Sequence, residues 1–353
     1  MSNPAPRPAP KTAFITGANG YIGHAVARAF LAAGYRTFGL VRRESAVKDL
    51  AVAEITPVVG TLDDLSFLDT QVYPYADRFD VIVNATEVVG GYAKHFEQSM
   101  QLVRTLAKRS LNNGVRPLVL WSTGCKDYGQ TGFHGDADLA PHTEESPVTG
   151  LGIIKERAES CQTVFHHKDL FDAALLFPTN VYGYTSSYWA AFLQYAAEQA
   201  KGRKVLTFAG NPNTISHGMH VDDCAAAYVA LAEHADRGAV AAQSFNISAY
   251  RYETSGEIAD ALAAEYGMEE ARWVPLDQAP EGYPPGLLFG MNWSQWVSSD
   301  KIRRVTGWSD KRALLTEDLK AYRRSYEAFE AAGHDNITVI KERMDKLFEG
   351  MAK

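Results

Sequence analysis

The first half of the chain alternates short apolar runs with segments that repeat apolar residues every three or four positions. The apolar positions of 21–33 fall on one face of a 3.6-residue period, which predicts an amphipathic helix that ends at Gly34. The runs predict buried strands at 12–16, 37–41, 55–59, 81–84, 118–122 and 173–177. Strands that alternate with helices are typical of a mainly parallel sheet covered on both faces. The pattern therefore predicts an α/β fold of the doubly wound, Rossmann type.

The second half is less regular and is rich in Gly, Asn, Ser and Tyr. Helices are predicted at 189–200, 221–232 and 254–266, and a strand at 244–247. We expect a smaller, mostly C-terminal substrate-binding domain here. The predicted organisation is a disordered Pro-rich tail (1–10), a Rossmann domain (11–177), a substrate-binding part (178–310) interleaved with the last Rossmann elements (221–247), and C-terminal helices (311–353).

Composition narrows the class of protein. Of 353 residues, 46% are hydrophobic and 22% charged, which is ordinary for a soluble globular protein. No apolar run is long enough to span a bilayer and no signal-peptide pattern opens the chain, so we expect a cytoplasmic protein without membrane partners. The net charge of −7 argues against nucleic acid. Three widely separated cysteines predict neither disulfides nor a zinc site, and no metal is expected.

A glycine-rich loop is the strongest motif. Gly17, Gly20 and Gly23 stand between a predicted strand and a predicted helix, with Asn19, Tyr21 and Ile22 among them. In this context such glycines allow a tight turn, close approach of a pyrophosphate, and close packing of helix on strand. The helix N-terminus offers its N–H groups to the phosphates. The sequence therefore predicts a dinucleotide site formed by these six residues.

Two arginines follow the next predicted strand. An NAD site usually has an acidic residue there for the ribose 2′-hydroxyl, whereas this chain has Arg42 and Arg43. Guanidinium groups suit a 2′-phosphate. We therefore expect NADP(H) as the cofactor; the alternative is a pair of solvated surface cations.

Several spaced segments resemble the epimerase/dehydratase branch of the extended short-chain dehydrogenase/reductase (SDR) superfamily. They begin with Thr16–Gly23 and continue with 80–86, 120–129, 177–183, 220–223 and 298–308. The resemblance implies that Thr123 orients a substrate carbonyl and that Lys155 holds the nicotinamide ribose. It also implies cofactor contacts at Leu62, Ala85, Thr86, Pro178, Asn180 and Val181.

One departure affects the chemistry. The family places a catalytic Tyr four residues before its Lys, but Leu151 stands at that position, and no Tyr of this chain lies four residues before a Lys. Lys155 itself could supply the proton. Tyr128 is our first choice among other donors, with packing as its alternative role. Thr123–Tyr128 is also similar to the TGxKxY segment of progesterone 5β-reductase-like enzymes, which implies a catalytic role for Lys126; the alternative is a solvated lysine.

These residues predict an NADPH-dependent oxidoreductase that reduces a carbonyl or enone with a non-standard proton donor. Aromatic residues of the second half favour a small, fairly apolar or aromatic substrate, with contacts expected at Tyr92, Tyr182, Tyr188 and His217. Two alternatives stay open: a redox-inactive NADP(H) sensor, and a lyase, isomerase or cyclase, including a sugar-nucleotide epimerase or dehydratase. The resemblance also implies a homodimer through helices around 96–111 and 155–165.

Overall fold

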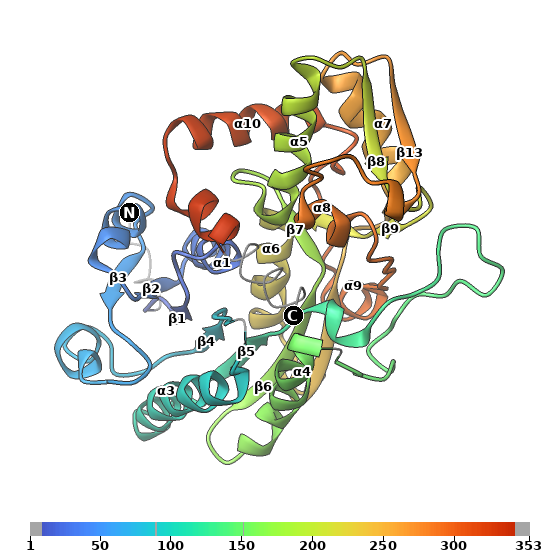
Figure 1. The fold of residues 1–353 in the computed structure, drawn as a ribbon. Coiled ribbons are helices and arrows are strands. Elements are labelled where there is room, and N and C mark those ends of the chain that lie inside the picture. The colour runs from blue at the N-terminus through green and yellow to red at the C-terminus, as the bar shows by residue number, and fades with distance from the viewer. Residues whose placement is uncertain (1–8, 89, 151, 343–353) are drawn as a thin grey trace, which may run out of the picture.

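The computed structural model describes residues 9–88, 90–150 and 152–342, and its centre is a parallel sheet (Figure 1). The seven strands lie in the order β11-β6-β5-β4-β1-β2-β3. This order confirms the predicted doubly wound sheet. The strands are β1 (Thr12–Thr16), β2 (Arg36–Val41), β3 (Thr56–Val59), β4 (Val81–Asn84), β5 (Leu118–Ser122), β6 (Asp172–Pro178) and β11 (Gln243–Ile247).

Helices cover both faces of this sheet. On one face, α1 (Tyr21–Ala32) packs beside α6 (Val221–Ala232), and on the other α3 (Tyr92–Asn112) packs beside α4 (Lys155–Gln162). Successive side chains of β1 pack on opposite faces of the sheet. Ala13 and Ile15 lie in the core under α1 and α6, whereas Phe14 lies in the core under α3. Burial on both faces explains why the strands read as continuous apolar runs.

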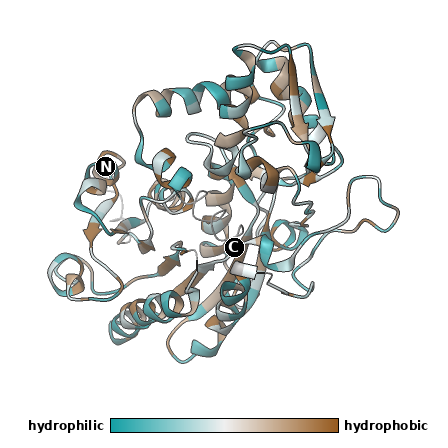
Figure 2. Cartoon of the chain, in the orientation of Figure 1, coloured by the Kyte–Doolittle hydropathy of each residue, from teal (hydrophilic) through white to brown (hydrophobic). Residues whose placement is uncertain are grey.

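A smaller lobe follows β6. Its core lies between α5 (Ala190–Ala200), α7 (Ser255–Glu265), α10 (Leu319–Ala331) and the parallel pair β8 (Val205–Ala209) and β13 (Glu270–Val274). The pair β8–β13 was not predicted, because β13 reads EARWV and is only partly buried. Residues 335–342 are also helical. Figure 2 shows hydrophobic residues along the central strands and hydrophilic residues on much of α3 and α10.

Shorter elements connect these units. They are α2 (Val47–Val52), β7 (Asn180–Tyr182), β9 (Ile215–Ser216), β10 (Gly218–His220), β12 (Glu253–Thr254), α8 (Pro285–Gly290), α9 (Asp300–Thr306) and several single turns of 3₁₀ helix. The turn η3 (Cys125–Tyr128) directly follows β5 and is central to the site. Among the described residues, no helix is both long and apolar enough to cross a bilayer.

Candidate functional site

The glycine loop joins β1 to α1 at the carboxyl edge of the sheet. Gly17 has φ +63°, and a Cβ there would lie 2.9 Å from the carbonyl oxygen of Ala85, so a larger residue is excluded by conformation and by space. A Cβ on Gly23 would collide with the Gly17 carbonyl. No side chain caps the N-terminus of α1, which leaves its first N–H groups for a ligand. The loop therefore fits the pyrophosphate of a dinucleotide.

Arg42 and Arg43 follow β2, and both are exposed. Neither forms an ion pair with another described residue, so both guanidinium groups have donors available for an anion. Leu62 is farther along the chain and packs partly into the core beneath α3. The role of Arg42 and Arg43 in binding a 2′-phosphate stays a prediction.

The end of β4 lies beside the glycine loop. The Thr16 hydroxyl donates to Asn84 Oδ1 at 2.9 Å, and the Ala85 N–H donates to Thr16 Oγ1 at 3.1 Å. Thr86 reaches His95 of α3 at 3.1 Å. Burial lowers the pKa of His95, and nearby Arg42 adds to this shift. Ala85 and Thr86 are half-buried at the edge where the cofactor contacts are expected.

A buried ionic network begins at the end of β5. The Thr123 hydroxyl donates to Asp127 Oδ2, and Arg157 donates to Asp127 Oδ1 from Nε at 3.0 Å and from Nη2 at 2.5 Å. Arg157 Nη1 also lies 2.5 Å from Glu87 Oε1 in the segment after β4. Burial raises the pKa of Asp127, while Arg157 and Thr123 oppose this by hydrogen bonding to its ionised form. The network ties the ends of β4 and β5 to α4.

This network limits what Thr123 can do. A hydroxyl has one hydrogen to donate, and that of Thr123 goes to Asp127. Its oxygen can still accept a hydrogen bond, but a substrate carbonyl requires a donor. In this structure Thr123 therefore belongs to the Asp127 network, which differs from the carbonyl-orienting role that the resemblance implies.

Lys126 lies on the same turn. Its Nζ is 4.7 Å from the ring centroid of Trp293, a residue that follows α8 in the smaller lobe. Burial lowers the pKa of Lys126 to about 8; Cys125 opposes this shift, and Arg157 adds a smaller contribution that also lowers the pKa. An ammonium group with this pKa can give up a proton near neutral pH.

Gln295 fixes the turn from the side of the smaller lobe. Its Nε2 donates to the carbonyl oxygens of Cys125 at 2.7 Å and Gly129 at 2.6 Å, and its Oε1 accepts from the Cys125 thiol at 3.1 Å. The Gln295 side chain is buried. Two parts of the chain, one before β6 and one after α8, therefore build the surroundings of Lys126.

Lys155 does not join Thr123 in this structure. It is the first residue of α4, its side chain is 64% exposed, and it pairs with Glu159 at 3.8 Å. Two residues correspond to about 200° around a helix, so the side of α4 opposite Lys155 carries Arg157 toward Asp127. Leu151, at the position of the missing tyrosine, lies outside the described residues.

The surroundings of Tyr128, our first choice of proton donor, favour its alternative role in packing. Tyr128 is buried, its ring stacks between His142 and Phe177, and its hydroxyl donates to Asn246 Oδ1 at 2.8 Å. Burial raises the pKa of Tyr128, which makes it a weaker acid. The packing role, which the sequence left as the alternative, describes Tyr128.

Three of the expected substrate contacts also lie in the core. Tyr92 contacts Cys161 Sγ at 3.4 Å, Tyr182 donates to the Ala313 carbonyl at 3.0 Å, and His217 Nε2 lies 3.0 Å from the Ala249 carbonyl oxygen. All three side chains are buried with their polar atoms used inside the protein, so they offer no substrate surface here. Tyr188 is half-buried.

Pro178, Asn180 and Val181 end β6 and form β7, next to the ends of β5 and β11. Pro178 and Val181 are buried and Asn180 is half-buried. Within the described ranges, no three His, Cys, Asp or Glu side chains gather where they could hold a metal ion.

Sequence reasoning missed Asp127, Arg157 and Gln295. Asp127 and Arg157 are 30 residues apart, and Gln295 is 170 residues from Cys125, so no local pattern links them. One signal was present: if Lys155 lies on the exposed side of a helix, Arg157 must point toward the protein interior. A buried arginine requires a carboxylate partner, which Asp127 provides.

The chain is similar to known proteins in sequence and in fold. A family model described as the NAD dependent epimerase/dehydratase family matches residues 13–248, from β1 through β11. The chain belongs to this family. The match confirms the resemblance to the extended SDR superfamily and places the chain among SDR-type, NAD-dependent enzymes.

Individual proteins match this chain at low sequence identity. An uncharacterized protein of Schizosaccharomyces pombe is 26% identical over 231 residues, which are 64% of this chain and 72% of that protein. The dTDP-glucose 4,6-dehydratase of Bacillus anthracis, in complex with NAD, superposes with a TM-score of 0.67 at 16% identity, over 91% of this chain and 98% of that one. UDP-glucose 4-epimerase of Thermotoga maritima, with UDP-glucose, gives 0.64 at 18% identity, over 90% and 99%.

Proposed function

We propose that this family member is an NADPH-dependent reductase of a small, fairly apolar carbonyl or enone compound, with Lys126 as proton donor. The observation that carries the proposal is the environment of Lys126: a partly buried ammonium group beside Trp293, with its pKa lowered to about 8. Because the Leu151 side chain cannot exchange a proton, another group must act as proton donor. The Tyr128 hydroxyl is less suited to this role because it already donates its hydrogen to Asn246 Oδ1.

The residues proposed for the cofactor fit a phosphorylated dinucleotide. The loop Gly17–Gly23 and the uncapped α1 suit the pyrophosphate, and the exposed Arg42 and Arg43, which form no ion pair within the described part of the chain, support a 2′-phosphate. When bound, the reduced cofactor supplies a hydride to the substrate carbon. Lys126 supplies the balancing proton to the carbonyl oxygen, or to the α-carbon of an enone, and recovers it from water. The indole of Trp293 favours an apolar or aromatic substrate beside Lys126.

Two observations support other functions. The named structural neighbours include a dTDP-glucose dehydratase and a UDP-glucose epimerase, which favours a lyase or isomerase acting on a sugar nucleotide with no net change of the cofactor. The replacement of the catalytic tyrosine by Leu151 favours a sensor that binds NADP(H) without redox chemistry.

Fluorescence titration with NADPH and, separately, with NADH is the first test, followed by assays with ketones, enones and UDP-glucose. Tight NADPH binding and steady NADPH consumption with a ketone or enone would support the reductase. Product formation from UDP-glucose without net NADPH consumption would identify the lyase or isomerase. Tight binding with no turnover would favour the sensor. No binding of either nucleotide would refute the reductase and the sensor, and would leave only chemistry without a dinucleotide.

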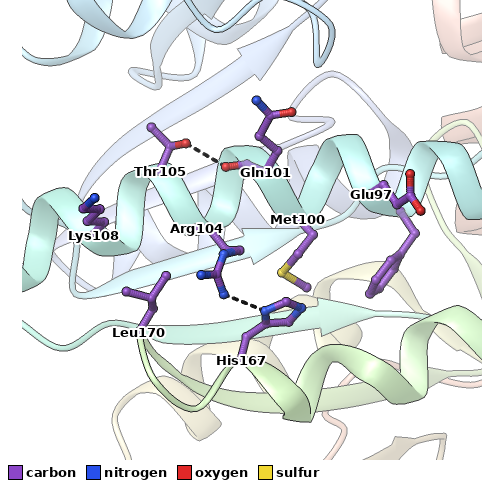
Figure 3. Close-up of a pocket in the computed structure, with 9 residues that line it drawn as sticks. Glu97, Met100, Gln101, Arg104, Thr105, Lys108, His167 and Leu170 are labelled. Atoms are coloured by element: carbon purple, nitrogen blue, oxygen red, sulfur yellow. Dashed lines mark hydrogen bonds between the residues drawn. The ribbon is translucent and has the colours of Figure 1, made fainter.

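The proposal also includes a homodimer in the cytosol. Figure 3 shows residues of α3 and of the turn after α4 that line a surface depression. The depression has a volume of about 460 Å³ and lies beside the helices that the resemblance assigns to the dimer contact. Met100 and Leu170 line the apolar part of this depression, beside Arg104, whose Nη1 lies 2.7 Å from His167 Nδ1. The cysteines support the proposed compartment: all three are free and buried, as suits reducing surroundings. Sedimentation velocity tests the dimer: a monomer at micromolar concentration would contradict it.

A further inference from the structure

Arg157 contacts Asp127, the buried carboxylate beside Lys126, and also pairs with Glu87, which follows the neighbouring strand β4. Its side chain is 10% exposed, and it donates twice to Asp127 and once to Glu87. Asp127 is fully buried. A carboxylate in such a place costs free energy unless it is paired and hydrogen bonded, so this turn depends on the arginine.

We infer that Arg157 is a positioning residue that, through Asp127, holds the turn Cys125–Tyr128 and thereby sets the place and the charge state of Lys126. This inference rests on the proposed role of Lys126 as proton donor. Arg157 is outside the glycine loop and the arginine pair proposed for the cofactor, and it touches the reacting groups only through Asp127.

The contacts show how the effect is transmitted. Asp127 joins Arg157 to the Thr123 hydroxyl, so both ends of the short segment 123–127 are held by one carboxylate. The Asp127 N–H donates to the Gly124 carbonyl at 3.0 Å, which closes the turn. Gln295 holds the opposite side through Cys125 and Gly129. Lys126 therefore projects from a turn that is anchored on both sides.

Charge gives Arg157 a second effect. Among the described residues, Cys125 and Arg157 act on the charge of Lys126. Asp127 on the same turn and Glu87 after β4 are the carboxylates that pair with Arg157, and the neighbouring Trp293 and Gln295 carry no charge. Arg157 disfavours the ammonium form of Lys126. If Arg157 is removed, Asp127 either stays ionised or takes up a proton. If Asp127 stays ionised, Lys126 loses a repelling cation and its pKa rises; if Asp127 takes up a proton, an attracting anion is lost as well and the rise is smaller.

The test measures Lys126 without requiring turnover. The wild-type protein and the variants Arg157→Met, Arg157→Lys and Arg323→Met are labelled with acetic anhydride across pH 6–11, and acetylation of Lys126 is measured by peptide mass spectrometry. Arg323 is the matched control, because it also binds two carboxylates, Glu265 and Glu327, in the smaller lobe.

We expect a midpoint near pH 8 for the wild type and for Arg323→Met, and a higher midpoint for Arg157→Met. Each unit by which the pKa of Lys126 rises lowers the rate of its acetylation at pH 7 by about tenfold. Arg157→Lys keeps the charge and should keep the midpoint, but it loses the two-point contact with Asp127, so kcat should fall at least about tenfold with the KM for NADPH unchanged.

A wild-type midpoint in Arg157→Met would overturn the inference. If that variant does not fold, judged by circular dichroism, Arg157→Lys decides: wild-type kcat overturns the inference, and a lower kcat with unchanged KM supports it. If no substrate is reduced by the wild type, the proposed function fails while the labelling midpoints still test Arg157.

Discussion

Lys126 Nζ lies 4.7 Å from the centroid of the Trp293 ring, which places a cation from the end of β5 against an aromatic side chain from the smaller lobe. Such a contact stabilises the ammonium by about 0.5–2 kcal/mol. Burial acts in the opposite direction and dominates, since the pKa falls to about 8. The proton donor proposed for this enzyme is therefore created by the meeting of the two lobes.

Replacing this lysine is the most direct prediction. Lys126→Met should lower kcat by about 100- to 10,000-fold, the range for loss of a general acid, while the Kd for NADPH stays within about twofold. Stopped-flow and steady-state measurements of NADPH oxidation check this. Lys204→Met, which changes an exposed lysine paired with Glu269, is the control and should behave as wild type. A Lys126→Met variant with normal kcat would remove Lys126 from the mechanism.

The pH dependence follows from the same group. Lys126 must be protonated to donate, and burial, reinforced by Arg157, lowers its pKa to about 8. The rate of reduction should therefore be constant below pH 8 and fall about tenfold per unit above it. A kcat profile between pH 6 and 10 checks this. A rate that rises through pH 8 would show that the neutral amine acts as a base.

Arg42 should decide between the two nicotinamide cofactors. Arg42→Ala should raise the Kd for NADPH about 10- to 100-fold, as expected for a lost charge-assisted hydrogen bond, and leave the Kd for NADH nearly unchanged. Fluorescence titration measures both constants. Arg272→Ala, at an exposed arginine paired with Glu270 in the smaller lobe, should change neither. An equal loss of affinity for NADPH and for NADH would refute the assignment of Arg42 to the 2′-phosphate.

Tyr128 should be structural. Tyr128→Phe removes the hydrogen bond to the buried Asn246 and should lower the free energy of unfolding by about 1–3 kcal/mol, with kcat within about twofold of wild type. Urea denaturation and NADPH oxidation measure the two effects. A large loss of kcat without loss of stability would return Tyr128 to the role of proton donor.

The expectations from sequence succeeded where the governing interactions are local. Gly17, Gly20 and Gly23 lie within seven consecutive residues, so the loop and the change from strand to helix could be recognised from the sequence. The apolar runs located all seven strands of the central sheet. The sequence did not predict strand β13, because it pairs with a strand that is distant along the chain. Its first residue, Glu270, pairs with Val205 of β8, which lies 65 positions earlier.

The amino-acid sequence by itself determined the nucleotide-binding half of this protein: the doubly wound sheet, the glycine loop and the arginines after β2. It also established that Leu151 replaces the usual tyrosine. Only the tertiary structure decided which side chains near β5 are packed in the core and which are only partly buried. Tyr128 and Lys126 are neighbours in one turn, and the choice between them depends on Asn246, Trp293, Arg157 and Gln295. Burial and pairing between such distant positions set acidity, and spacing along the chain does not encode them.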